Sequence, residues 1–60
     1  MKFLKLNQVI EKTSLSRSSI YRKMDSKEFP LAINLGGRAI AWLESDIEEW
    51  MYDKIESIQG

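Results

Sequence analysis

Cysteine and histidine are both absent from this sequence of 60 residues. Without cysteine the chain forms no disulfide bridge and no reactive thiolate, and without either residue the usual structural zinc sites are excluded. No segment approaches the roughly 18 apolar residues that a membrane-spanning helix needs, and residues 1–6 lack the apolar run of a signal peptide. We therefore expect a protein of the reducing cytoplasm that has no membrane partner.

The same absences leave little material for catalysis. No nucleophile can be paired with a base, because histidine and cysteine are missing and the serines fall at a predicted helix cap and on a cationic surface. Asp46, Glu48 and Glu49 have an ordinary role at the positive end of a helix dipole. Gly36-Gly37 lacks the lysine and hydroxyl residue that complete a phosphate loop. The sequence predicts no enzymatic activity, cofactor, metal ion or small-molecule substrate.

Acidic residues are few in the first part of the chain and basic residues are few in the second, although the whole sequence has nine of each. Residues 1–38 hold eight basic and three acidic residues, whereas residues 39–60 hold one basic and six acidic residues. The two parts therefore carry net charges of +5 and −5. Such a division favours one surface that attracts a polyanion and an opposite surface that repels it.

Polar capping residues mark two helices in the first half of the chain. Asn7 offers a side-chain oxygen to cap a short helix over residues 8–13, and Ser16 offers one to a second helix. At about 100° per residue, the second helix directs Ile20 and Met24 to one side, which we expect to be buried. The close succession of the two helices predicts a helix-turn-helix.

A β-hairpin is predicted after the second helix, which should end before Phe29-Pro30 because proline disfavours helix. Residues 31–35 and 38–42 alternate as strands do, and Gly36-Gly37 can adopt the positive φ angles of a two-residue turn. The resulting register pairs Leu35 with Arg38, Ile33 with Ile40 and Leu31 with Trp42. This register turns the large apolar side chains of both strands toward the core.

The C-terminal segment predicts the longest helix. Ser45 to Glu48 match a capping box, and apolar residues then recur at steps of three and four. We expect this stripe to pack on the hairpin and the first helix; its members are Ile47, Trp50, Met51, Ile55 and Ile58. With an edge strand over residues 3–6, residues 1–60 predict a single α+β domain that is mostly helical. Its fold would be a small winged helix-turn-helix of two short helices, a β-hairpin wing and a C-terminal helix.

The second helix predicts a DNA-binding surface. No acidic residue occurs from Thr13 to Met24, and the polar side of the helix carries hydroxyl and cationic side chains. Arginine and lysine displace counterions from phosphates, while serine, tyrosine and arginine reach base edges in the major groove. The candidate DNA-binding residues are Arg17, Ser18, Ser19, Tyr21, Arg22 and Lys23, together with Arg38 beyond the wing turn of Gly36 and Gly37. A solvated helix face without a ligand is the alternative interpretation.

The expected roles of these residues differ. We assign base readout to Arg22, whereas Tyr21 is equally compatible with packing at the edge of the core and with a phosphate contact. Arg38 follows two glycines whose small size lets the backbone approach a phosphate, so we expect it to contact the DNA backbone or a minor groove. Trp42 and Trp50 could stack on bases, but both lie on apolar stripes and are expected in the core.

Several short motifs resemble those of the AlpA-like family of phage regulators, a branch of the MerR-like winged-helix proteins that is also similar to phage excisionases. The matching segments are residues 15–22, Phe29-Pro30, residues 35–39, residues 42–47 and Glu49-Trp50, so the resemblance covers nearly the whole chain. The family's turn between the first two helices usually contains a glycine, which Ser14 replaces here. In a left-handed conformation this replacement would cost on the order of 1 kcal/mol.

The resemblance implies a cytoplasmic, nucleoid-associated regulator of transcription that is encoded by a prophage or another mobile element and binds double-stranded DNA. RNA polymerase and integrase are the protein partners it suggests, and self-association on DNA would place the acidic C-terminal helix against the basic face of a neighbour. The alternative is an excisionase that bends attachment-site DNA and cooperates with integrase. A second alternative, based on the charge division alone, is a small protein-binding inhibitor that uses the acidic C-terminal helix.

Overall fold

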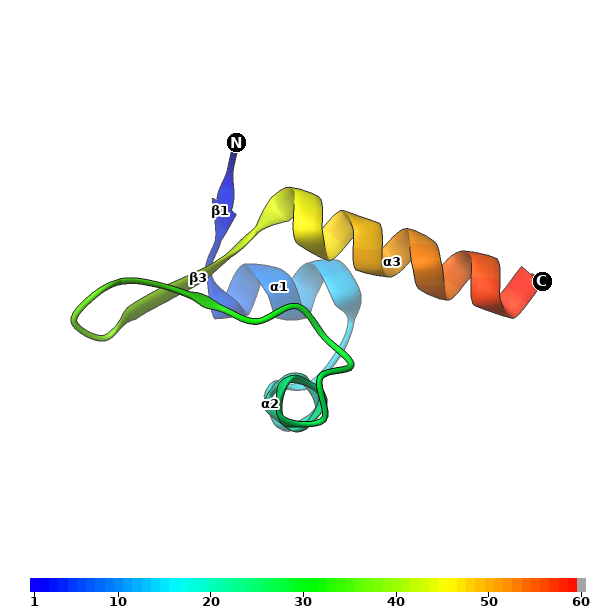
Figure 1. Cartoon of the computed structure of the whole chain (residues 1–60), viewed down its shortest axis with the longest axis horizontal. Helices are drawn as coiled ribbons and strands as arrows, with labels where there is room; N and C mark the ends of the chain where they lie inside the picture. Colours follow the sequence, from blue (N-terminus) through cyan, green and yellow to red (C-terminus); the bar gives the residue numbers. More distant parts are fainter. Residues whose placement is uncertain (60) are drawn as a thin grey trace.

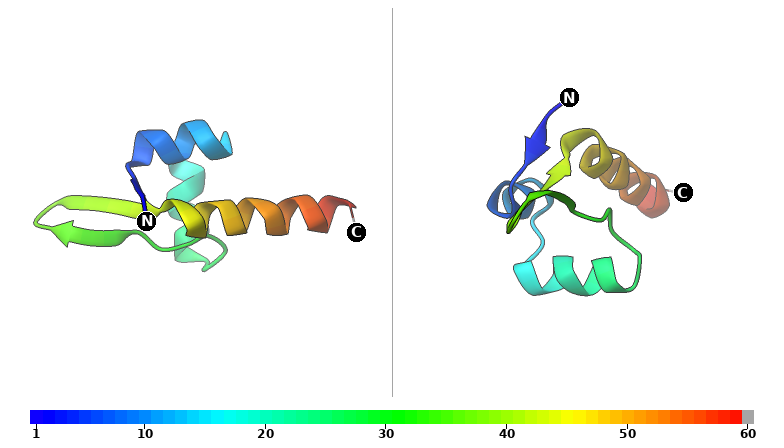
Figure 2. Two further views of the ribbon diagram at one scale, coloured as in Figure 1. Left: turned by 90° about the horizontal axis from the view of Figure 1, so that it is seen from above. Right: turned by 60° about the vertical axis from the view of Figure 1, so that its left-hand side comes forward.

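Six secondary-structure elements make up the computed structural model, which describes residues 1–59 (Figure 1). They are β1 (Phe3–Leu4), α1 (Leu6–Thr13), α2 (Arg17–Asp25), β2 (Ile33–Gly36), β3 (Ala39–Leu43) and α3 (Glu44–Gln59). The hairpin of β2 and β3 projects at one end of the molecule and α3 extends toward the other, while α2 runs across the line that they form (Figure 2). The predicted α+β architecture of two short helices, a hairpin and a C-terminal helix is confirmed.

Helix α2 begins directly after its predicted cap Ser16 and ends at Asp25, before Phe29-Pro30 as predicted. The Ser16 hydroxyl accepts a hydrogen bond from the Ser19 backbone N–H at 3.2 Å, which satisfies one of the free N–H groups of the first turn. Ser14 forms the turn between α1 and α2 with φ 63° and ψ 16°, and its N–H donates to the Ile10 carbonyl at 2.8 Å. Ser14 is therefore left-handed, the conformation in which a glycine would be strain-free.

The start of α1 differs from the prediction, because the helix begins at Leu6 and not near Gln8. Lys5 is the N-cap, and the Gln8 side-chain oxygen reaches back to accept a hydrogen bond from the Lys5 N–H at 2.8 Å. This is one half of a capping box, and it moves the helix start two residues toward the N-terminus. Asn7 lies inside the first turn, where its side-chain oxygen accepts from the Gln8 N–H at 3.0 Å.

A three-stranded antiparallel sheet in the order β1-β3-β2 joins the two ends of the sequence. The predicted edge strand is present but covers only Phe3–Leu4, which pair with Leu43 and Trp42 respectively. Helix α3 follows β3 without a separate cap, so Ser45 lies in its first turn and not at the predicted cap position. The Glu44 N–H donates instead to the Lys2 carbonyl at 2.8 Å, so the residue before β1 satisfies this N–H group.

The predicted register of the hairpin is wrong. Strand β2 pairs Ile33 with Ala41, Asn34 with Ile40 and Gly36 with Ala39, which leaves Leu35 as an extra residue in a bulge. The two turn residues are Gly37 and Arg38, and both Gly36 and Gly37 have positive φ, at 131° and 57°. The cause is local: the Asn34 side-chain oxygen accepts the Gly36 N–H at 2.8 Å and shifts the turn by one residue.

The shifted register reverses the faces of β2. Since side chains alternate along a strand, a shift of one residue moves a whole apolar set from the core to the solvent. Leu31, Ile33 and Leu35, predicted to face the core, are 64%, 37% and 51% exposed. Ala32 packs against the core in their place, although its side chain fills far less space. The outer face of the wing is consequently apolar.

The core gathers one or two residues from nearly every element. Its buried members are Leu4, Val9, Ile20, Phe29, Trp42 and Ile47. Both tryptophans belong to this region as predicted: Trp42 is fully buried, and Trp50 is half-buried with its ring 4.8 Å from that of Phe29. Their indole N–H groups donate to backbone carbonyls of the loop after α2, Trp42 to Pro30 at 3.0 Å and Trp50 to Glu28 at 2.8 Å. These bonds fasten the loop to the sheet and to α3.

Only the first half of α3 covers the core. Ile47 is fully buried and Trp50 and Met51 are half-buried, whereas Ile55 and Ile58 are 46% and 86% exposed. The prediction that the whole stripe packs on the hairpin and α1 is therefore wrong for its last two members. Their helix turns extend past the ends of α1 and the sheet (Figure 1). No helix within residues 1–59 has the length and apolar character needed to cross a membrane.

Candidate DNA interface

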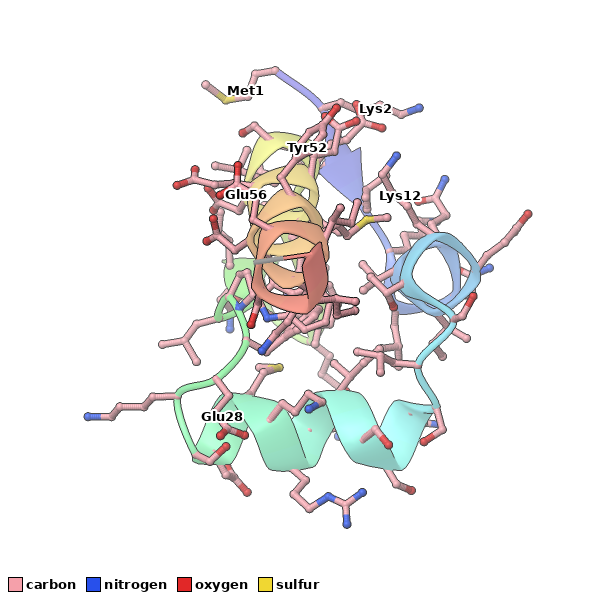
Figure 3. All side chains as sticks on the ribbon, turned by 90° about the vertical axis from the view of Figure 1, so that its right-hand side faces the viewer. Met1, Lys2, Lys12, Glu28, Tyr52 and Glu56 are labelled. Carbon is pink, nitrogen blue, oxygen red and sulfur yellow. The ribbon has the colours of Figure 1, made fainter. Side chains whose placement is uncertain are left out.

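Helix α2 separates a buried face from an exposed one, as its pattern predicts. Ile20 is fully buried and Met24 is half-buried against the core. Ser18 and Arg22 are exposed on the other side of the helix, and Arg17 is exposed in its first turn. In the view along α3, helix α2 lies across the bottom of the molecule, so the outer face of α2 points away from the body (Figure 3). An outward helix with this accessibility can approach the major groove of DNA.

The cations of α2 and the wing are not neutralised by carboxylates of the same chain. Within residues 1–59, the ion pairs are those of Lys12 with Glu44 at 3.9 Å and with Glu48 at 3.6 Å. These pairs connect α1 to α3 and involve neither Arg22 nor Arg38. Because unpaired surface cations release counterions when they meet phosphates, Arg17, Arg22 and Arg38 remain available to attract a polyanion.

A short chain of hydrogen bonds orders the outer face of α2. The Ser16 hydroxyl donates to Ser19 Oγ at 2.9 Å, and Arg22 Nη2 donates to the same Ser19 oxygen at 3.4 Å. The N-cap of the helix is thereby connected to the arginine that we assigned to base readout. Sequence reasoning missed this connection, although a spacing of three between Ser16, Ser19 and Arg22 places all three near one another on a helix.

Two of the predicted α2 residues, Ser19 and Lys23, are half-buried, and Tyr21 is only moderately exposed. Lys23 is half-buried, and its carbonyl accepts hydrogen bonds from the Glu28 N–H at 2.8 Å and from the Ser26 hydroxyl at 3.1 Å. Its backbone therefore anchors the loop after the helix. Tyr21 is 38% exposed, an intermediate position that agrees with both of the roles considered for it.

The wing places Arg38 at the tip of the hairpin. Arg38 is exposed and follows Gly37 in the two-residue turn. A Cβ atom built on Gly36 or Gly37 would meet no atom within 4 Å, so the need for glycine comes from the positive φ angles and not from crowding. The structure thus places the α2 candidates on one short helix, with Ser18 and Arg22 on its outer face, and Arg38 in the turn of the hairpin, which projects separately from that helix (Figure 2).

The acidic residues lie mainly on α3, away from α2. Tyr52 and Glu56 occupy the side of α3 remote from α2 (Figure 3). No group of three or more aspartate or glutamate side chains within residues 1–59 is arranged to hold a metal ion. The carboxylates of α3 instead give this part of the surface a sign opposite to that of α2.

The fold and the basic helix are those of a helix-turn-helix regulator, and comparison with known proteins places the chain in a family. Residues 2–55 match the family described as prophage CP4-57 regulatory protein (AlpA). The chain belongs to this family, as the motifs predict. The family consists of regulatory proteins and not of enzymes.

Two relatives illustrate the similarity. The chain is 41% identical over 54 residues to the uncharacterized protein ORF88 of Enterobacteria phage P4, a match that spans 90% of this chain but only 61% of the relative. It is 31% identical over 64 residues to the DNA-binding transcriptional activator AlpA of Escherichia coli (strain K12), which covers 97% of this chain and 91% of that protein.

Proposed function

We propose that this protein binds double-stranded DNA through α2 and the wing and regulates transcription for a prophage or another mobile element. The observation that carries the proposal is the outer face of α2, which is exposed, has no carboxylate before Asp25 in its last turn, and carries cations that make no ion pair within residues 1–59. A DNA-binding regulator of this kind acts at the nucleoid in the bacterial cytoplasm. The description of the E. coli relative as a DNA-binding transcriptional activator supports the same function.

The proposed contacts follow from the geometry of the two projections. Residues 17–23 enter a major groove, where Arg22 donates to a base edge and Arg17 neutralises a phosphate. Arg38 at the wing tip reaches the sugar-phosphate backbone or the adjacent minor groove. Excision of a prophage would require the same DNA-binding step, but both the family description and the E. coli relative favour regulation.

Binding of a duplex from the protein's own mobile element tests the proposal. The Arg22→Ala, Arg38→Ala double variant is compared with a Lys2→Ala, Lys54→Ala variant, which removes the same charge outside α2 and the wing. We expect the first variant to lose at least about 1–3 kcal/mol of binding and to lower the salt slope by about 2, because two contacts are removed. Equal losses in both variants, or no binding by the wild type at low salt, would contradict the proposal.

A further inference from the structure

A hollow lies between the loop after α2 and the first half of α3. It has a volume of about 430 Å³ and is lined by two aromatic residues and several carboxylates. We name it the acidic groove, after Glu28, Asp46, Glu49 and Asp53 around Phe29 and Trp50. The indole is held in place by its hydrogen bond to the Glu28 carbonyl and by the edge-on contact with Phe29. The groove therefore combines a fixed apolar floor with a negative rim.

The negative charge of this groove is largely uncompensated. None of its four carboxylates takes part in an ion pair within residues 1–59, and Lys27 is the one basic residue of the lining. The Lys54 ammonium lies over the Trp50 ring, 5.5 Å from its centroid, so the face of this indole can contact a cation. DNA is repelled from such a groove, whereas a protein surface that combines apolar and cationic side chains complements it.

The wing has those complementary properties. Its outer face exposes Ile33 and Leu35, its tip carries Arg38, and no acidic residue occurs from Leu31 to Leu43. In a docked wing the carboxylates of the groove take the place of the DNA backbone as the partner of Arg38, whereas in an undocked wing Arg38 stays on the DNA. The wing and the body of α3 extend toward opposite ends of a molecule 41 Å long, so the wing cannot fold back into the groove of its own chain (Figure 1). The wing of a second copy can reach it.

We infer that the wing of one copy docks into the acidic groove of the next, so that copies assemble head to tail along DNA. This inference rests on the proposed function, because DNA supplies the surface on which the copies meet. Electrostatics favours this arrangement over contacts between identical surfaces. A contact between two α3 helices would bring two acidic surfaces together, and a contact between two α2 helices would bring two basic surfaces together, so both would be repulsive. A head-to-tail contact leaves a free wing and a free groove at the two ends, so the row can grow.

The arrangement of DNA sites follows from this contact. Successive copies in a head-to-tail row have the same orientation, whereas the two copies of a symmetric dimer face in opposite directions. The protein should therefore protect direct repeats in DNA and not inverted repeats. Binding to neighbouring sites should be cooperative, because the first bound copy raises the local concentration of docking surface for the second.

The absence of native cysteine permits a direct test by disulfide cross-linking. A Leu35→Cys chain is mixed with an Asp53→Cys chain, both alone at high protein concentration and on a duplex from the mobile element. Each chain is also oxidised by itself, and a mixture of Leu35→Cys with Ser57→Cys serves as control because Ser57 is exposed on α3 outside the groove lining. We expect the first mixture to form covalent dimers roughly ten-fold faster than the other samples.

Several outcomes would overturn the inference. Faster cross-linking of Leu35→Cys with itself would indicate a wing-to-wing contact, and faster cross-linking of Asp53→Cys with itself a contact between α3 helices. Equal rates in all samples would show that no specific contact exists. The DNA-free samples decide the question even if the wild type does not bind DNA, a result that would refute the proposed function separately.

A second variant tests the groove without a cysteine. The Glu49→Gln, Asp53→Asn protein removes two exposed charges of the rim and leaves α2 and the wing intact. We expect its affinity for a single DNA site to equal or slightly exceed that of the wild type, while cooperativity between two sites falls several-fold. Unchanged cooperativity would contradict docking into the acidic groove.

Discussion

Helices α2 and α3 pack on the same core but present outer faces of opposite charge. Ile20 of α2 and Ile47 of α3 are both fully buried, whereas Arg22 and Glu49 are exposed on the outer surfaces of their helices. The way in which the two helices are anchored is therefore similar. Their exposed residues decide which ligand each can approach, because a polyanion is attracted by α2 and repelled by α3. The net charge of zero conceals this division.

The largest expected effect concerns the anchoring that the two helices share. Ile20→Ala leaves a cavity where α2 meets the core and should cost about 2–5 kcal/mol, which approaches the entire stability of a domain of this size. Ile58→Ala at the far end of α3, where the side chain is 86% exposed, should change stability by less than about 0.5 kcal/mol. Thermal unfolding followed by circular dichroism measures both. Similar losses would show that the end of α3 is also packed.

A second prediction concerns the turns that orient the two helices. Helix α3 continues directly from β3, whereas α2 depends on the left-handed Ser14. Ser14→Gly should raise the free energy of unfolding by about 1 kcal/mol, since glycine adopts this conformation without the Cβ penalty. For so small a domain this corresponds to an increase of roughly 4–8 °C in Tm. DNA affinity should be unchanged, and a decrease in Tm would contradict the assigned conformation.

The sequence predicts α2 and its charged face well because the relevant interactions are local. Ser16 caps the helix, and the spacing of Ile20 and Met24 indicates which side is buried. The hairpin register could not be read in the same way. Two adjacent glycines suggest a turn centred on both, but the Asn34 side chain takes the Gly36 N–H and moves the turn to Gly37 and Arg38.

The outer half of α3 shows a different limit of the sequence pattern. Periodicity identifies the face on which Ile47, Ile55 and Ile58 lie, but it does not tell how far the neighbouring elements extend. Helix α1 ends at Thr13 and the sheet is short, so the last turns of α3 have nothing to pack against within residues 1–59. The candidate DNA-binding residues were identified from the charges of the side chains and their positions around the predicted helix. The acidic groove could be identified only from the structure, because its lining comes from two segments that are separate in the sequence.

A third prediction tests whether hydrogen bonding on the outer face of α2 contributes to recognition. Ser19→Ala removes the oxygen that receives hydrogen bonds from Ser16 and Arg22, and it should reduce the preference for cognate over random DNA by about two- to five-fold. Non-specific affinity should not change, because the positive charge is retained. Ser57→Ala is the control, since Ser57 is an exposed serine of α3 outside the candidate DNA-binding residues. An equal effect of both variants, or a parallel loss of non-specific binding, would contradict a positioning role for Ser19.

The smallest expected effect concerns the ion pairs that connect α3 to α1. Lys12→Ala should lower stability by about 0.2–1 kcal/mol, because its partners Glu44 and Glu48 are partly exposed and the attraction is screened by water. Lys5→Ala, which removes an equal charge without an ion pair, should have a smaller effect. Denaturant unfolding at low and high salt compares the two variants. A Lys12 effect that does not decrease with salt would indicate a packing contribution.

The division of the surface into a DNA-binding side and an acidic back is tested most directly by nuclear magnetic resonance. The uniformly ¹⁵N-labelled protein is titrated with a duplex from its own mobile element that holds a single binding site, so that no second copy docks, and the shifts of the backbone amides are followed. The predicted result is that the largest changes occur at residues 16–23 and 36–38, while the outer residues of α3 change little. Largest changes along α3, with residues 16–23 unaffected, would contradict the account.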